Sequence, residues 1–177
     1  MSDGRLRTVA AIGLVVGATL GMAGSFAPTA ELRSLAWGAD ATAIVIACAL
    51  LVVHHLRNGN DGLAAGFLVF LSGETLIVSG SRMGLVESAP TFAAGAALWS
   101  GGLALISASG VLPLFLRATG AIAAVLFAVT AARIFAGADL TPLSKPLPFS
   151  AYPFLAITLF GWAWAHAGRA RARVATA

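Results

Sequence analysis

Hydrophobic positions along this chain form long continuous blocks, and charged residues collect in the short segments between them. Six such blocks can be recognised, and each is about as long as a helix that crosses a bilayer, since ~20 residues rising ~1.5 Å each span ~30 Å of hydrocarbon. The pattern therefore predicts an all-α bundle of six transmembrane helices. We expect the spans at about residues 8–26, 40–56, 62–80, 91–112, 114–137 and 151–167.

The third block is the most informative, because it contains a carboxylate, Glu74, within an otherwise apolar run. An acid within a membrane span is costly unless it faces protein, water or a partner. Small residues also recur in this run at a spacing of seven, which lets a neighbouring helix approach closely at a shallow left-handed crossing. These small pairs are Ala65-Gly66, Ser72-Gly73 and Ser79-Gly80. We therefore expect Glu74 to face another helix.

Glycines also form a ridge in the first block, at Gly13, Gly17 and Gly21. This GxxxGxxxG spacing is typical of a helix-packing face. The basic start and apolar middle of this segment also suit a signal peptide. Its full length and its ridge favour a retained helix. Gly95 and Gly102 repeat the spacing of seven in the fourth block.

Composition supports a membrane protein and excludes several other classes. Hydrophobic residues make up 59% of the 177 residues and charged residues only 10%, against about 25% charged in soluble domains. The mean hydropathy is +0.91. We expect residues 1–177 to form one integral membrane domain, with the lipid bilayer as its main partner. The single cysteine, Cys48, excludes an intrachain disulfide, and no zinc spacing or Gly-rich phosphate loop is present.

The distribution of basic residues predicts the orientation of the bundle. Basic residues on the side of the N-terminus are Arg5, Arg7, Arg57, Arg117, Arg169, Arg171 and Arg173. Those on the opposite side are Arg33, Arg82, Arg133 and Lys145. The positive-inside rule then places both termini in the cytoplasm of a bacterial-type cell, with the protein in its inner membrane. The net charge of +4 comes from scattered helix ends, so nucleic acid is not an expected partner.

With this orientation, several polar residues fall at a similar depth in the outer half of the membrane. Glu74 and Arg133 are expected there as an ion pair, and the proline-containing segment 138–150 is expected to be extended and to lie over them. The candidate pocket consists of Glu74, Arg133, Asp40, Arg82, Thr130 and Tyr152. Alternatively, a Glu74–Arg133 bridge only fixes helix register, or Arg133 extends to the membrane surface, as basic residues near helix ends do.

Three histidines, His54, His55 and His166, fall at the cytoplasmic ends of the second and sixth spans. Histidine is a common metal ligand and an axial ligand of haem. Adjacent histidines point about 100° apart on a helix, so at most one of the pair faces His166. We expect all three to lie near lipid headgroups, with a metal or haem site as the alternative. Trp162 and Trp164 are expected to be interface anchors.

The leading functional hypothesis is a permease-like or channel-like protein with a polar outer-leaflet site around Glu74 and Arg133. A second hypothesis is a non-catalytic scaffold subunit that binds another membrane protein, or a second copy of itself, through the glycine seams. A third is a membrane-embedded redox or haem protein that uses the inner histidines. Enzymatic activity is not expected, because serines within membrane spans usually hydrogen-bond to the carbonyls of their own helix. A resident cofactor is not expected either.

Overall fold

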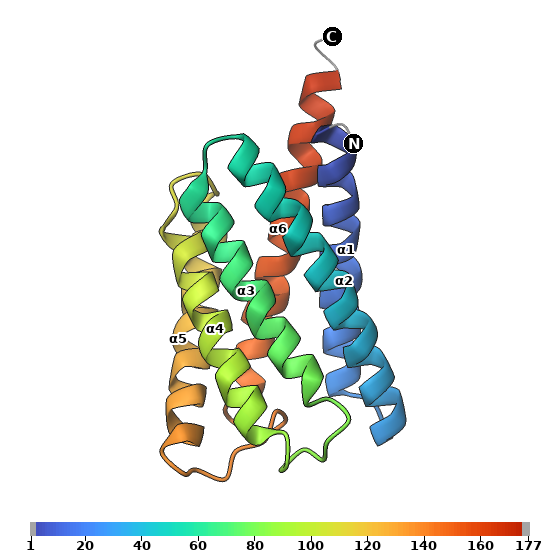
Figure 1. Ribbon diagram of the computed structural model, residues 1–177, viewed down its shortest axis with the longest axis vertical. Coiled ribbons are helices and arrows are strands. Elements are labelled where there is room, and N and C mark those ends of the chain that lie inside the picture. The colour runs from blue at the N-terminus through green and yellow to red at the C-terminus, as the bar shows by residue number, and fades with distance from the viewer. Residues whose placement is uncertain (1–2, 175–177) are drawn as a thin grey trace.

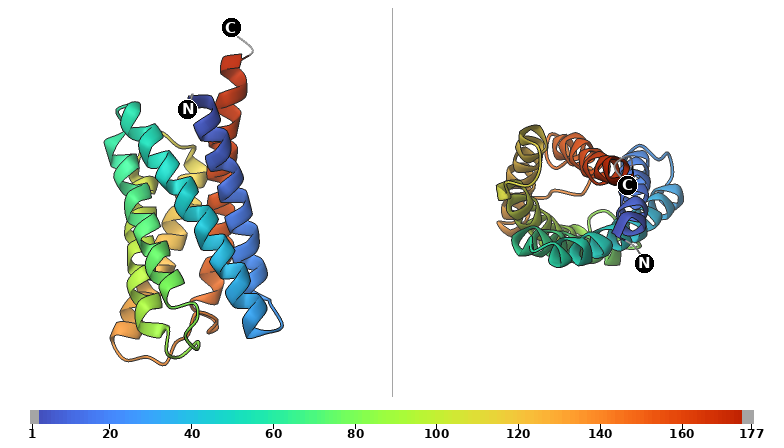
Figure 2. Two further views of the ribbon diagram at one scale, coloured as in Figure 1. Left: turned by 45° about the vertical axis from the view of Figure 1, so that its right-hand side comes forward. Right: turned by 90° about the horizontal axis from the view of Figure 1, so that it is seen from above.

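Six helices form a closed ring in the computed structural model, which describes residues 3–174, with side chains for residues 3–167 (Figure 1). The helices are α1 (Asp3–Ser25), α2 (Ala30–Arg57), α3 (Asp61–Ser79), α4 (Ala89–Ala108), α5 (Leu114–Phe135) and α6 (Tyr152–Val174). Each helix packs against the next, and α6 returns to pack against α1. The view from above in Figure 2 shows this ring directly. The described residues contain no strand, so the all-α prediction is confirmed.

Five of the helices, α1 to α5, are long and apolar enough to cross a membrane. The surface of the ring is apolar as well: Ile12 is 59% exposed, Val125 62% and Trp164 63%. Together these features indicate a multi-pass membrane protein. The sixth helix has 23 residues. The orientation prediction also uses Arg169, Arg171 and Arg173. Their side chains lie beyond residue 167, outside the described side chains.

The helix that contains the second predicted span starts earlier than that span, because α2 begins at Ala30 rather than at residue 40. The side-chain oxygen of Thr29 accepts a hydrogen bond from the Leu32 amide at 3.2 Å, which caps the helix. Glu31 in the first turn adds a favourable interaction with the helix dipole. As a result Asp40 lies well inside the helix and not in its first turn.

The glycine seams bring pairs of helices into close contact. A Cβ atom at Gly13 in α1 would lie 2.9 Å from the carbonyl oxygen of Ala43 in α2. A Cβ at Gly73 in α3 would lie 2.7 Å from the carbonyl oxygen of Gly95 in α4. The seams are therefore packing faces, as their spacing predicts, but each is filled by a neighbour in the same chain.

Residues 138–150 do not form an extended strap. The backbone turns twice, with hydrogen bonds from the Ser144 amide to the Thr141 carbonyl at 3.1 Å and from the Ser150 amide to the Pro146 carbonyl at 2.9 Å. A short 3-10 helix, Phe149–Ala151, then leads into α6. These hydrogen bonds replace the open polyproline geometry expected from the prolines, and they fold the segment back over the end of the ring.

Candidate functional site: a cavity with two acidic residues at one end of the ring

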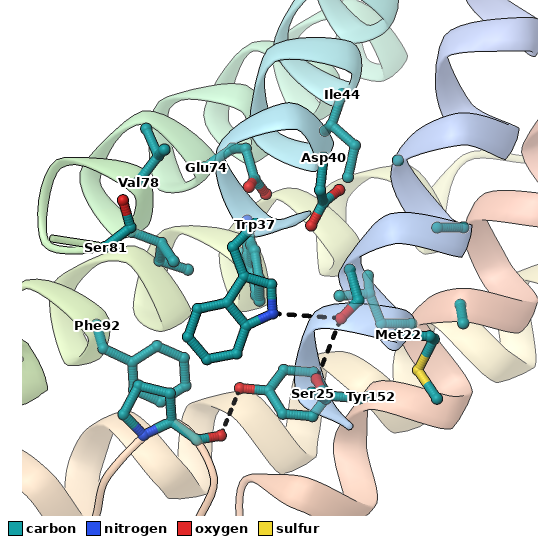
Figure 3. Close-up of a pocket in the computed structure, with 18 of the residues that line it drawn as sticks. Met22, Ser25, Trp37, Asp40, Ile44, Glu74, Val78, Ser81, Phe92 and Tyr152 are labelled. Atoms are coloured by element: carbon teal, nitrogen blue, oxygen red, sulfur yellow. Dashed lines mark hydrogen bonds between the residues drawn. The ribbon is translucent and has the colours of Figure 1, made fainter. Parts of the chain in front are cut away.

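A cavity of about 80 Å³ lies inside the ring, toward the end where α1 joins α2 and α3 joins α4 (Figure 3). Helices α1, α2, α3, α4 and α6 supply most of its walls. The lining residues are Gly17, Ala18, Gly21, Met22, Ser25, Trp37, Asp40, Ile44, Glu74, Ile77, Val78, Gly80, Ser81, Ser88, Phe92, Trp99, Pro142, Tyr152, Leu155, Ala156 and Leu159. None of these residues is basic, although two are acidic.

Asp40 reaches the cavity because α1 has no side chains opposite it. A Cβ at Gly21 would lie 2.6 Å from Oδ2 of Asp40, and a Cβ at Gly17 would lie 3.1 Å from Oδ1. The glycine ridge thus does more than bring α1 close to α2, since it leaves the volume that the carboxylate occupies. Oδ1 of Asp40 is buried and has no hydrogen-bond partner.

Glu74 approaches the same space from α3. Its side chain is 3% exposed, and Oε2 is buried without a hydrogen-bond partner. The Trp99 indole is close enough to interact with the carboxylate, but its Nε1 does not form a hydrogen bond of good geometry. Asp40 and Glu74 also interact electrostatically, and Figure 3 shows both carboxyl groups facing one space. Buried polar atoms left unpaired are costly, so the site favours a ligand or ordered water.

Hydrogen bonds to backbone carbonyls hold the mouth of the cavity. Trp37 donates its Nε1–H to the carbonyl of Gly21 at 3.3 Å, which ties α2 to the last turns of α1. The Tyr152 hydroxyl donates to the carbonyl of Pro142 at 2.7 Å. That bond anchors segment 138–150, and Pro142 itself lines the cavity. The segment therefore covers this end of the site.

A layer of aromatic rings separates the cavity from the opposite end of the ring. Trp99 stacks on Phe70 with centroids 5.8 Å apart, and Phe70 contacts Trp162 edge-on at 5.6 Å. Trp162 also contacts Phe67 at 5.0 Å. Trp162 is 1% exposed, so its predicted role as an interface anchor is wrong. It lies on the face of α6 that points into the ring, whereas Trp164 lies on the outer face.

Of the residues expected in the pocket, the structure brings together Glu74, Asp40 and Tyr152. Arg133 is exposed in the last turn of α5 and does not pair with Glu74. Arg82 is exposed in the loop that follows α3. Thr130 is fully buried, but its hydroxyl bonds to the Leu126 carbonyl at 2.8 Å, away from the cavity. The expected Glu74–Arg133 ion pair is thus not formed.

Two tryptophans in the cavity wall, Trp37 and Trp99, are absent from the set of residues that the sequence pattern predicts for the site. Trp99 carries a recognisable signal, because it lies near the middle of its span rather than at the interface. A tryptophan at that depth still needs a partner for its N–H. Trp37 has the position of an interface anchor only if the second span starts at residue 40. The Thr29 cap, which starts α2 earlier, explains its place inside the ring.

The three histidines come together at the other end of the ring, and two of them are buried there. His55 is 2% exposed and His166 is 4% exposed, so the expected position near lipid headgroups is wrong for this pair. Nε2 of His55 lies 3.1 Å from Nε2 of His166. His54 Nδ1 lies 2.7 Å from a carboxylate oxygen of Asp3, an acid that sequence spacing does not associate with it.

Tertiary packing explains why these histidines are inside. His55 stacks on Phe67 with ring centroids 5.5 Å apart and an interplanar angle of 1°. His166 is held by the carbonyl of Trp162, one turn earlier in α6, at 2.6 Å from Nδ1. Within the part of the chain that the structure describes, no three His, Cys, Asp or Glu side chains are arranged to hold a metal ion.

The apolar helices indicate a helical, multi-pass membrane protein, and its internal cavity contains two acidic residues in a mostly apolar lining. Comparison with known proteins adds no narrower class: no protein family, curated protein or solved structure matches this chain.

Proposed function

We propose that this protein is a small permease-like or channel-like membrane protein that binds a solute in the cavity between Asp40 and Glu74. The observation that supports this best is a pair of buried carboxylate oxygens in the cavity that have no hydrogen-bond partner, Oδ1 of Asp40 and Oε2 of Glu74. A purely structural carboxylate in a membrane bundle is normally paired with a basic group or a hydrogen-bond donor. A solute would supply that partner.

The proposal includes an orientation. By the positive-inside rule, the cavity faces the outside of the cell and both termini lie in the cytoplasm, with six spans in the inner membrane. The aromatic layer of Phe67, Phe70 and Trp162 would then be the barrier between the outer cavity and the inner histidines. Passage of a solute would require these rings to move, as expected of a gate.

Solute flux in proteoliposomes tests this function. Purified protein is reconstituted, and stopped-flow light scattering follows vesicle volume under gradients of small charged and neutral solutes. We expect the wild-type protein to accelerate entry of at least one solute over empty vesicles. Glu74→Gln should abolish that acceleration. Glu87→Gln is the matched control, because Glu87 is an exposed acid in the loop between α3 and α4, and it should behave as the wild type.

The outcomes separate function from structure. If Glu74→Gln unfolds at the wild-type temperature and has lost flux, Glu74 acts in permeation. If wild-type vesicles show no flux for any solute tested, or if Glu87→Gln loses flux to the same extent as Glu74→Gln, the permease proposal is wrong.

A further inference from the structure

We infer that the occupant of the cavity is a small primary ammonium ion, of the size of ammonium or methylammonium. This inference rests on the proposed binding site and adds the chemical class of the ligand. It depends on three properties of the described residues: the charge of the lining, the hydrogen-bonding capacity that is left unused, and the size of the space.

Charge gives the sign of the ligand. Asp40 and Glu74 both line the cavity, and no Lys, Arg or His does. Arg33 lies beside the site, with its guanidinium 6.0 Å from the centre of the Trp37 ring, but it is not part of the lining. Two carboxyl groups without a basic partner favour a cation over an anion or a neutral solute.

Hydrogen bonding distinguishes an ammonium ion from a metal ion. The unpaired oxygens of Asp40 and Glu74 are acceptors, and an ammonium group offers several N–H donors that can reach oxygens on two different helices. A hard metal ion such as Ca²⁺ instead needs six or more oxygen ligands. The described residues include no group of three or more His, Cys, Asp or Glu side chains that could hold a metal ion. The donor set therefore fits N–H groups better than a metal.

The walls and the volume set the size of the ligand. Trp37, Phe92, Trp99 and Tyr152 add aromatic rings to the cavity lining, and such rings attract organic cations through their faces. The cavity has about 80 Å³, whereas a cavity of ~150 Å³ takes a molecule the size of benzene. An ammonium ion with few heavy atoms fits this space. Gly17 and Gly21 preserve this space, since a Cβ at Gly21 would meet Asp40.

Thermal unfolding of the intact protein in detergent tests the ligand class. The probes are methylammonium chloride, sodium chloride at equal ionic strength, and formamide as a neutral molecule of similar size. A ligand that binds only the folded state raises the unfolding temperature in proportion to its occupancy. We expect methylammonium to give a saturable rise and the other two probes to give none. Asp40→Asn and Glu74→Gln should weaken methylammonium binding at least about tenfold, and Glu87→Gln should not change it.

Each other result overturns the inference in a recognisable way. An equal rise with sodium indicates an alkali-cation site, and an equal rise with formamide indicates a neutral solute site. No rise with any probe means that the cavity does not bind this class. If the acid variants fail to fold, Trp99→Phe replaces them as the test, because it keeps both carboxylates. This variant should still bind methylammonium, but with altered affinity. An unchanged affinity of Trp99→Phe for methylammonium contradicts the site. Saturable binding without flux in vesicles would refute the permease proposal and leave the ligand assignment standing.

Discussion

The Nε2 atoms of His55 and His166 lie 3.1 Å apart and join α2 to α6 across the end of the ring opposite the cavity. The other contacts of this pair indicate which ring nitrogens carry a proton. His166 Nδ1 lies 2.6 Å from the carbonyl oxygen of Trp162, and a carbonyl only accepts, so Nδ1 carries a proton. In the neutral pair, Nε2 of His166 is then the acceptor and Nε2 of His55 the donor. Two helices that are not consecutive in the chain are thus connected by one directional bond.

We expect this bond to appear as coupling in a double-mutant cycle. His55→Ala and His166→Ala should each lower the free energy of unfolding by about 1–3 kcal/mol, because each leaves a buried polar partner behind. The double variant should lose less than the sum of the two, with an interaction energy of about 0.5–3 kcal/mol. Denaturant titration of the purified variants in detergent micelles measures all four values. Strictly additive losses would mean that the two rings do not stabilise each other.

The close contact between α3 and α4 supports a second prediction, which compares the stability effects of alanine substitutions at two glycines. Gly73→Ala would put a Cβ 2.7 Å from the carbonyl oxygen of Gly95, so the helices must separate. We expect a loss of about 1–3 kcal/mol in stability. Gly38, inside α2, has open space beside it, since a Cβ there would meet no atom within 4 Å, and Gly38→Ala should be neutral or stabilising by up to about 1 kcal/mol. Thermal unfolding of both variants checks the sign of each effect. A Gly73→Ala variant as stable as the wild type would contradict the close packing of α3 on α4.

The hydroxyl of Tyr152 supports a third prediction, about the cover of the cavity. Tyr152→Phe removes only the donor to the Pro142 carbonyl, a bond of 2.7 Å. We expect a stability loss of about 0.5–1.5 kcal/mol and faster reaction of a cysteine placed at Ser81, which lines the cavity. The control is Thr8→Val, whose exposed hydroxyl bonds only within α1. Unchanged labelling of Ser81→Cys in the Tyr152→Phe background would show that segment 138–150 is held by other contacts.

The sequence predicts the helices of this fold well, because long apolar runs have few alternatives in a membrane. It also indicates that Glu74 needs a partner, since an acid within a membrane span is costly. It does not indicate which helix faces which. Arg133 lies at a suitable depth for Glu74, but depth along a span says nothing about direction around it, and the side chain of Arg133 is exposed. The missing information is the direction in which each side chain points around its helix axis, and the packing of the helices determines that direction.

The same reasoning explains the histidines and Trp162. Position near a span end is typical of residues at the lipid interface, yet His55 and Trp162 are both at most 2% exposed. Both side chains lie on helix faces that point into the ring, so they are buried although they are near the expected ends of their spans. The cap at Thr29 is visible in the sequence as a threonine followed by an acid two residues later, and this signal corrects the start of α2.

The orientation of the bundle is the last prediction, and cysteine labelling in cells tests it. Cys48 is fully buried, so the wild-type protein should resist a membrane-impermeant maleimide until it is unfolded. In a Cys48→Ser background, single cysteines replace Asn58, in the turn between α2 and α3, and Met83, in the loop between α3 and α4; both positions are exposed. The excess of arginine on the side of Asn58 predicts that this turn lies in the cytoplasm. Met83→Cys should therefore react in intact cells, and Asn58→Cys only after permeabilisation. The opposite pattern would reverse the orientation and turn the Asp40–Glu74 cavity toward the cytoplasm, and equal labelling of both would indicate that the chain inserts in two directions.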